Sequence, residues 1–221
     1  MSIKCDKCGK ETDSKYEYCG HCGHKLVSEN NIVFILDRSG SMHGQESATI
    51  DSYNEFLERH RDDEVDTYVT TVLFDDRYEL LNNHEKIENV SNLTTDEYYT
   101  RGCTALYDAI GKTIKEISHT AKGHVIFVIT TDGFENASNE YNKKSVSQLI
   151  KEHENYEFLY IGANIDSYKE AQSIGIQKRN IANRSADSEG LATSFDAVDR
   201  FYSRSINNEI IDESWKEDIK E

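Results

Sequence analysis

Oxygen-bearing side chains follow an apolar run of the chain in a pattern that suits a hard cation. Residues 32–36, IVFIL, lead directly into Asp37, Ser39 and Ser41, which form a D-x-S-x-S motif. One carboxylate and two hydroxyls therefore stand where a buried strand is expected to end and its loop to begin. Such oxygens suit Mg²⁺ or Mn²⁺, and ligands gather at the carboxyl edge of the sheet in open α/β folds. The motif alone is weak evidence for a cation site.

Two later segments each add one oxygen ligand to this set. Thr104 stands at the start of an apolar stripe that predicts a helix, and Asp132 follows the apolar run 124–129. An alternative interpretation is that the three hydroxyl residues are ordinary turn and cap residues and that the two aspartates cap helices. We favour a cation site, because all five residues in this order, behind strands and at a helix start, are hard to obtain by chance.

The motif, the threonine and the second aspartate together resemble the metal-ion-dependent adhesion site (MIDAS) of von Willebrand factor A (VWA) domains. The resemblance covers roughly residues 30–205. It implies that Ser39 and Ser41 bind Mg²⁺, or Mn²⁺ or Ca²⁺, directly, and that Thr104 binds directly when a partner is present and through water otherwise. It implies that Asp37 and Asp132 act mainly through waters. One coordination position is then left for a Glu or Asp side chain of a partner protein.

The sequence departs from the family pattern at few points. No proline lies near Asp132, and Cys103 stands where a glycine or another small residue often precedes the threonine. Neither departure removes an ion ligand, and we expect Cys103 to be a small buried side chain. Four other residues lie near the expected site in the sequence and are candidates for partner contact: His43, Tyr107, Glu135 and Asn136.

Four cysteines near the N-terminus form a second candidate metal site. Cys5, Cys8, Cys19 and Cys22 make two C-x₂-C pairs, each followed by glycine, and they resemble the Cys₄ shell of a short zinc ribbon. A segment of this size cannot bury enough apolar surface to fold alone, so bound Zn²⁺ would supply on the order of 10 kcal/mol of folding free energy. His21 and His24 could replace a cysteine, but four thiolates already fill the shell.

Composition limits the classes of function. The 221 residues suffice for one full domain and a small appendage, and a formal charge of −16 argues against broad affinity for nucleic acid or anionic membranes. No apolar stretch has the length that a signal peptide or a membrane span needs, so we expect a cytoplasmic protein. In a reducing compartment, paired cysteines are more often metal ligands than disulfides.

Apolar strands alternate with amphipathic helices from residue 31 onward, which predicts an α/β, Rossmann-like VWA domain. We expect a central, mainly parallel sheet of about six strands, flanked by helices on both faces. The expected strands are 32–36, 66–74, 78–81, 124–129, 158–162 and 179–182, of which 78–81 is an antiparallel edge strand. Six helices are expected, including 46–60 and one from Thr104, and Ser145 with Gln148 is expected to form a capping box.

Three units are expected: a zinc ribbon at 1–27, the VWA domain at 28–206 and an acidic C-terminal tail at 207–221. The tail is interpreted either as a frayed helix that packs Trp215 on the domain or as a segment that binds a partner.

The leading functional hypothesis is a non-enzymatic adaptor that captures a partner carboxylate through Mg²⁺ and uses the ribbon as a structural or second contact surface. A Mg²⁺-dependent hydrolase or phosphotransfer protein is an alternative, although the sequence holds no G-x-x-x-x-G-K-[ST] loop and no G-x-S-x-G elbow. Nucleic-acid contact through the ribbon is another, although its lysines and acidic residues nearly balance. The identity of the partner and the oligomeric state stay open.

Overall fold

Long buried strands form the centre of the molecule. The computed structural model describes residues 2–5, 7–13, 18–24, 29–63, 65–163, 165–207 and 209–219. Within them, β3 (Asn30–Asp37), β4 (Thr67–Phe74) and β6 (His124–Thr131) are buried over almost their whole length. Strands buried on both faces read as continuous apolar runs, which explains why these segments were recognisable in the sequence.

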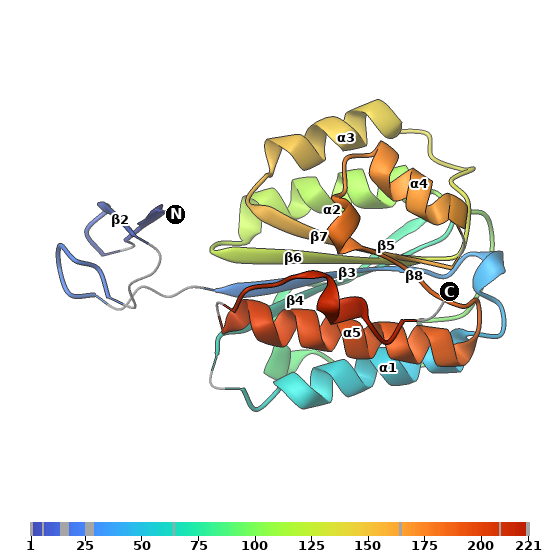
Figure 1. The fold of residues 1–221 in the computed structure, drawn as a ribbon, viewed down its shortest axis with the longest axis horizontal. Coiled ribbons are helices and arrows are strands. Elements are labelled where there is room, and N and C mark those ends of the chain that lie inside the picture. Colours follow the sequence, from blue (N-terminus) through green and yellow to red (C-terminus); the bar gives the residue numbers. More distant parts are fainter. Residues whose placement is uncertain are drawn as a thin grey trace.

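The main sheet has six strands in the order β5-β4-β3-β6-β7-β8. The remaining strands are β5 (Tyr78–Lys86), β7 (Tyr156–Gly162) and β8 (Ile181–Asn183). Only the β4–β5 pair is antiparallel, and the other neighbours are parallel. This result confirms the predicted, mainly parallel sheet with an antiparallel edge strand. The carboxyl ends of the five parallel strands therefore meet at one edge, on the right in Figure 1.

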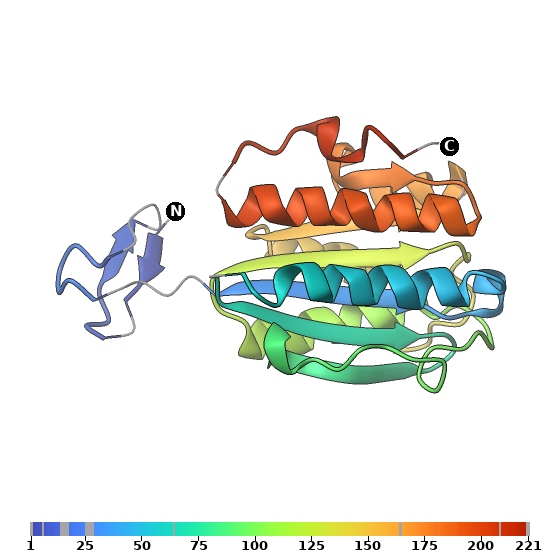
Figure 2. The ribbon, with the colours of Figure 1, turned by 90° about the horizontal axis from the view of Figure 1, so that it is seen from below.

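Helices cover both faces of this sheet (Figures 1 and 2). One face carries α1 (Glu46–His60) and α5 (Ser188–Ile206), and the other carries α2 (Leu106–Thr120), α3 (Lys143–Glu152) and α4 (Ile165–Ser173). Successive side chains of β3 alternate between the two cores. Phe34 packs against Phe56 and Phe195 on the α1–α5 side, with ring centroids 5.2 and 6.1 Å away, whereas Ile35 belongs to the opposite core.

The helix count and one helix start differ from expectation. The described residues form five α-helices with several short 3₁₀ turns, not six helices. The capping box of α3 is made by Asn142 and Ser145, not by Ser145 and Gln148. The backbone N–H of Ser145 donates to Asn142 Oδ1 at 3.1 Å, and that of Asn142 donates to Ser145 Oγ at 2.9 Å. The extended backbone of Asn142 places its short amide over the free N–H groups of the first turn, which explains the correction.

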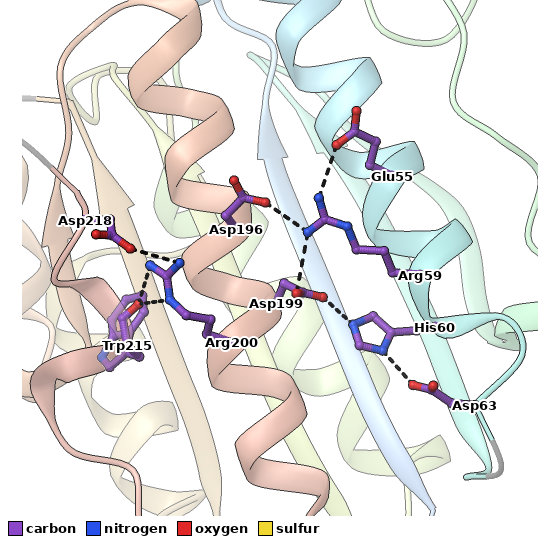
Figure 3. Close-up of polar contacts among 9 residues, drawn as sticks. All are labelled: Glu55, Arg59, His60, Asp63, Asp196, Asp199, Arg200, Trp215 and Asp218. Atoms are coloured by element: carbon purple, nitrogen blue, oxygen red, sulfur yellow. Dashed lines mark hydrogen bonds and ion pairs between the residues drawn. The ribbon is translucent and has the colours of Figure 1, made fainter.

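A buried histidine joins α1 to α5 (Figure 3). His60 contacts Asp63 through Nδ1 and Asp199 through Nε2, both at 2.7 Å, and its ring packs 4.9 Å from that of Tyr202. Burial lowers the pKa of His60, but the hydrogen bonds and charges of Asp199 and Asp63 outweigh it, so that the pKa is raised overall. Beside it, Arg59 pairs with Asp196 at 2.9 Å. Opposite charges thus hold the two helices together around an aromatic contact.

Replacing His60 with Gln is expected to change how stability depends on pH. Because the pKa is higher in the folded protein, the charged ring stabilises the fold fully below the unfolded-state pKa of about 6.5, and this contribution is lost as pH rises through the folded-state pKa. The free energy of unfolding in urea should therefore differ more between wild type and H60Q at about pH 6 than at about pH 9. H119Q, at an exposed position of α2, should follow the wild type. A pH-independent difference would contradict this account.

The C-terminal segment packs onto the domain through a tryptophan (Figure 3). Trp215, in the 3₁₀ turn Glu213–Lys216, is fully buried, and its ring lies edge-on to Phe201 at 5.6 Å. Its Nε1 donates to the carbonyl of Arg179 at 2.9 Å, and Arg200 donates to the Trp215 carbonyl from Nε and Nη2 at 3.2 and 3.1 Å. Of the two interpretations of the tail, packing on the domain is the one observed, and Trp215 offers a partner no exposed surface.

Trp215→Ala is expected to lower the free energy of unfolding by about 3–5 kcal/mol, because it removes a fully buried aromatic side chain and leaves a cavity. Ile210→Ala is the matched control in the same segment. Ile210 is 92% exposed, and its truncation should change stability by no more than about 0.5 kcal/mol. Urea unfolding measures both changes in stability, and circular dichroism is the signal to follow because it does not require the tryptophan. Equal effects of the two substitutions would show that the segment is not part of the folded domain.

Candidate metal centres

The first candidate site lies where β3 and β6 end. These strands pair in parallel with Leu36 opposite Thr130, so the residues that follow them emerge side by side. The chain crosses from β3 to β4 on one side and reaches β6 on the other, which makes the gap between β3 and β6 the switch point of the sheet. Ligands of open α/β folds bind in the crevice at such a point. The topology alone therefore selects this edge.

The predicted ligands converge on the space beside Gly133. A Cβ placed on Gly133 would lie 2.5 Å from Thr104 Oγ1 and 3.0 Å from Ser41 Oγ. The same atom would lie 3.2 Å from Asp37 Oδ2. Ser39 Oγ lies 3.1 Å from Ser41 Oγ. Three oxygen-bearing side chains from two segments thus surround one point that only a glycine leaves open, and Ser39 lies beside them. This donor set fits a hard divalent cation.

Asp37 is the most deeply buried member of the group. Its Oδ1 accepts the backbone N–H of Ser39 at 2.7 Å, and its Oδ2 accepts the hydroxyl of Thr131 at 2.5 Å. Tyr98 donates its hydroxyl to the Asp37 carbonyl at 2.5 Å. Burial raises the pKa of Asp37 to about 6, against the lowering effect of the hydrogen bonds from Thr131 and Ser39, and the charge of Asp132 raises it further. A cation would offset the unfavourable charge of this carboxylate.

Asp132 is oriented by a side chain from the start of α1. Gln45 Nε2 donates to Asp132 Oδ2 at 2.7 Å, and Gln45 is itself buried. The charge of Asp132 acts on Asp37, so the fifth predicted ligand belongs to the same cluster. Sequence reasoning missed Gln45 and Thr131, the residues that orient the two aspartates. Thr131 directly precedes Asp132, but only the path of the strand directs the Thr131 side chain inward. Nothing in the sequence around Gln45 indicated a role at the site.

Arg38 anchors the loop that carries the serines. It is almost fully buried, and its Nε donates to Asp75 Oδ2 at 3.0 Å and its Nη2 to Glu79 Oε2 at 2.6 Å. Arg101 Nε reaches the same Asp75 oxygen at 2.6 Å. Burial raises the pKa of Asp75, but the Arg101 hydrogen bond, the Arg77 N–H and the Arg38 charge outweigh it and lower the pKa overall. Asp75 directly follows β4, and Asp37 is the last residue of β3. This shared position at a strand end was the sequence signal that could have indicated the role of Asp75.

The loop that carries Thr104 is held by residues that had been candidates for partner contact. Asn136 Oδ1 accepts the N–H of Thr104 at 2.9 Å, and Glu135 Oε2 accepts the N–H of Tyr107 at 2.9 Å. Glu135 also accepts hydrogen bonds from the backbone and hydroxyl of Ser138. Asn136 and Glu135 therefore support the start of α2, and the hydroxyl of Tyr107 donates to Glu170. His43 has an 84% exposed side chain.

Cys103 is exposed, so the expectation that it is buried is wrong. The adjacent Thr104 takes the inward-facing position and is 3% exposed.

The four N-terminal cysteines form the second candidate site. Their Sγ atoms all lie within 4.8 Å of one another. Cys5 Sγ lies 3.6 Å from Cys22 Sγ, and Cys8 Sγ lies 3.7 Å from Cys19 Sγ. A tetrahedral zinc site with Zn–S bonds of about 2.3 Å requires sulfur separations of about 3.8 Å, so the thiols fit Zn²⁺.

The two cysteine pairs have the same local geometry. Gly9 and Gly23 both have φ of 66°, which lets each turn direct its N–H back to the carbonyl of the first cysteine at 2.8 Å. A backbone N–H from His21 lowers the pKa of Cys19 to about 6, against the raising effect of burial, and so favours its thiolate. Against the lowering effect of a backbone N–H from His24, burial and the neighbouring thiols raise the pKa of Cys22. Strands β1 (Ser2–Lys4) and β2 (Glu11–Asp13) pair antiparallel beside the first turn.

The six-stranded sheet and the oxygen cluster at its switch point define an α/β domain with a candidate cation site. A profile of the von Willebrand factor type A domain matches residues 31–197, and the chain belongs to this family. A comparison with curated proteins gave no match. None of the helices in the described part of the chain combines the length and apolar character that crossing a membrane needs.

Several solved structures share the fold. The vWF domain of the type V pili tip protein Mfa5 from Porphyromonas gingivalis is 10% identical with a TM-score of 0.62, covering 84% of this chain and 99% of that one. The PilB minor pilin from Streptococcus sanguinis is 12% identical with a TM-score of 0.63, covering 81% and 62%. Proximal thread matrix protein 1 from the mussel byssus, with a zinc-occupied MIDAS motif, is 16% identical with a TM-score of 0.56, covering 79% and 46%. The chain thus spans less than two thirds of the pilin and of the mussel protein.

Purified protein is expected to contain one Zn²⁺ per chain at the four thiols, because their separations match a tetrahedral shell. Cys19→Ser should lose this zinc and leave the unfolding of the VWA domain unchanged, since that domain has its own cores. Cys103→Ser removes the remaining cysteine and should keep the zinc. Elemental analysis and circular dichroism measure the two effects. Full zinc content in C19S, or zinc loss in C103S, would refute the assignment.

Proposed function

We propose that this chain is a non-enzymatic binding protein that captures an acidic side chain of a partner protein through a divalent cation. Mg²⁺, or Mn²⁺ or Ca²⁺, would be held by Ser39, Ser41 and Thr104, with Asp37 and Asp132 acting mainly through waters. The observation that carries the proposal is the convergence of three oxygen-bearing side chains on the open position beside Gly133.

The chemistry of the cluster supports this division of roles. The oxygens of Asp37 already accept hydrogen bonds from Ser39 and Thr131, and Asp132 accepts one from Gln45. The hydroxyls are therefore better placed as direct ligands than the carboxylates. When bound in such a shell, the cation supplies an electrophilic centre that attracts an anionic oxygen. Ser41 is exposed whereas Ser39 and Asp37 are buried, so the cluster is open to a partner on the Ser41 side.

Exposed side chains around the cluster offer a contact surface. Phe134 follows Gly133 directly and is 60% exposed. Tyr99 is 44% exposed, and the Arg101 guanidinium lies 5.2 Å from its ring centroid. Large exposed aromatic residues and arginine are enriched in protein interfaces. We assign to Phe134 and Tyr99 the apolar contacts that a single metal–carboxylate bond needs for specificity.

The similar structures support a binding role over an enzymatic one, because they include a minor pilin and a pilus tip protein. The mussel protein with a zinc-occupied MIDAS motif supports a cation at the corresponding edge of the fold. For the N-terminal cysteines we propose a structural Zn²⁺ and a second contact surface on which Tyr18 is 53% exposed. Reduced thiols arranged for a metal suit a cytoplasmic location.

The first test is a titration with Mg²⁺ alone, followed by thermal unfolding. Binding to the folded state should stabilise the wild type by about 2.7 kcal/mol when Mg²⁺ reaches 100 times its dissociation constant. Thr104→Ala and Gly133→Ala should abolish this gain, the first by removing a ligand and the second by filling the open position. In EDTA, T104A should lie within about 1 kcal/mol of the wild type, because the group serves a site at a helix start and not the core.

Thr193→Ala is the matched control, since Thr193 is a partly exposed threonine of α5 whose hydroxyl donates to the Glu189 carbonyl of the same helix. It should keep the full Mg²⁺ effect. A pull-down with and without EDTA then tests capture: a protein retained only with Mg²⁺, and lost with T104A or after Glu→Gln replacement in the partner, is the expected result. Undiminished capture in EDTA, or a T104A protein that responds to Mg²⁺ like the wild type, would refute the proposal.

A further inference from the structure

A second buried arginine lies behind the turn that carries the serines. Arg184 follows β8, is 1% exposed, and its N–H donates to the Gly162 carbonyl at the end of β7 at 2.9 Å. Its Nη1 donates to the Ser185 carbonyl at 2.9 Å, and its Nη2 lies 3.9 Å from Met42 Sδ. Its Nε has no hydrogen-bond partner among the residues that the structure describes.

This environment is costly for a guanidinium. Taking such a group out of water costs several kcal/mol unless charges and hydrogen bonds compensate, and here the hydrogen bonds go to one carbonyl and one sulfur. Burial lowers the pKa of Arg184, whereas the charges of Asp132, Asp187 and Asp37 raise it. Arginine stays protonated in proteins, so the compensation comes from these carboxylates acting at a distance.

Arg184 is placed to act on the acidic pair of the cation site. Met42, which it contacts, belongs to the turn Gly40–Met42 that also carries Ser41. Gln45, three residues further on, holds Asp132. Two neighbouring carboxylates repel each other, and the charge of the partly buried Asp132 acts on the buried Asp37. A fixed positive charge behind the turn lowers this repulsion.

We propose that Arg184 is a resident positive charge that stabilises the Asp37–Asp132 pair in the metal-free protein and thereby weakens the binding of a divalent cation. The inference rests on the proposed cation site and assigns Arg184 a positioning role, because the hydrogen bonds given for its side chain go to Ser185 and Met42. Its two effects have opposite signs. The guanidinium raises the stability of the metal-free protein, and it repels a cation that arrives at the same carboxylates.

Because the effects on stability and on cation binding have opposite signs, they distinguish a charge effect of Arg184 from a packing effect. If Arg184 only filled space, its replacement would loosen the turn at Met42, lower stability, and leave the affinity for Mg²⁺ unchanged or weaker. If it acts by charge, its replacement lowers stability in EDTA but strengthens Mg²⁺ binding. Coulomb's law predicts that a unit charge about 8 Å from a divalent ion changes the binding constant by roughly sixfold at the dielectric constant of water, and by more at the lower effective value of a partly buried site.

The experiment compares Arg184→Met, Arg184→Gln and Arg184→Lys with the wild type in the full chain. Thermal unfolding in EDTA measures the metal-free stability, and calorimetric titration with MgCl₂ measures the affinity. R184M and R184Q should melt at lower temperature in EDTA and bind Mg²⁺ at least roughly sixfold more tightly. R184K keeps the charge and should bind Mg²⁺ like the wild type. Arg59→Gln removes the same charge from the α1–α5 contact and should leave the affinity unchanged.

Each outcome decides between the alternatives. Equal or weaker Mg²⁺ binding by R184M and R184Q overturns the role of Arg184, and so does an R184K protein that binds as tightly as R184M. Variants that stay unfolded both in EDTA and in Mg²⁺ also overturn it, because packing is then the main role, whereas variants that fold only with Mg²⁺ support it. A wild type that binds no Mg²⁺ refutes the cation site itself, which distinguishes failure of the proposed function from failure of this inference.

Discussion

The fully buried carboxyl group of Asp37 is the constraint on which the carboxyl edge of the sheet depends. A carboxylate at the end of a central strand has no access to water, and its pKa is raised accordingly. The neighbouring elements supply hydrogen bonds to this buried carboxylate: the turn after β3 supplies the Ser39 N–H, and β6 supplies the Thr131 hydroxyl. Gly133 then keeps free the space into which the remaining oxygens point. The turn, the strand end and the glycine that stabilise the buried carboxylate thus also arrange the oxygen donors of the candidate cation site.

Buried arginines complete the electrostatics of this edge. The chain carries a formal charge of −16, yet Arg38 and Arg184 are both almost fully buried here. Arg38 is paired directly with Asp75 and Glu79 and fixes the loop in place. Among the described residues, the hydrogen bonds given for the Arg184 side chain go to Ser185 and Met42, and we infer that it acts on the acidic pair by charge. Arg38 thus fixes the position of the loop, while Arg184 contributes to the electrostatic field at the candidate cation site.

The two parts of the chain are stabilised by different means. The VWA domain has an apolar core on each face of its sheet, with further anchoring by Trp215 and the α1–α5 contacts. The N-terminal segment has a cluster of cysteine side chains in place of such a core. With zinc at the proposed site, a folded state there would depend on the metal ion, whereas the domain depends on packing. This difference allows the two candidate metals to be tested separately.

Local patterns in the sequence were sufficient for the strands, for the helix at 46–60, for the paired cysteines and for the D-x-S-x-S motif, because period, apolar runs and spacing are properties of neighbouring residues. The mainly parallel character of the sheet also followed from the alternation of strands and helices, whereas the order of the strands did not. The tertiary structure alone decided which side chains orient the site. Thr131 meets Asp37, Gln45 meets Asp132 and Arg184 meets Met42 only after residues far apart in sequence are brought to one edge. The exposure of Cys103 likewise depends on the path of the backbone. The cap at Asn142 depends on which of the competing side chains reaches the free N–H groups of the first helical turn.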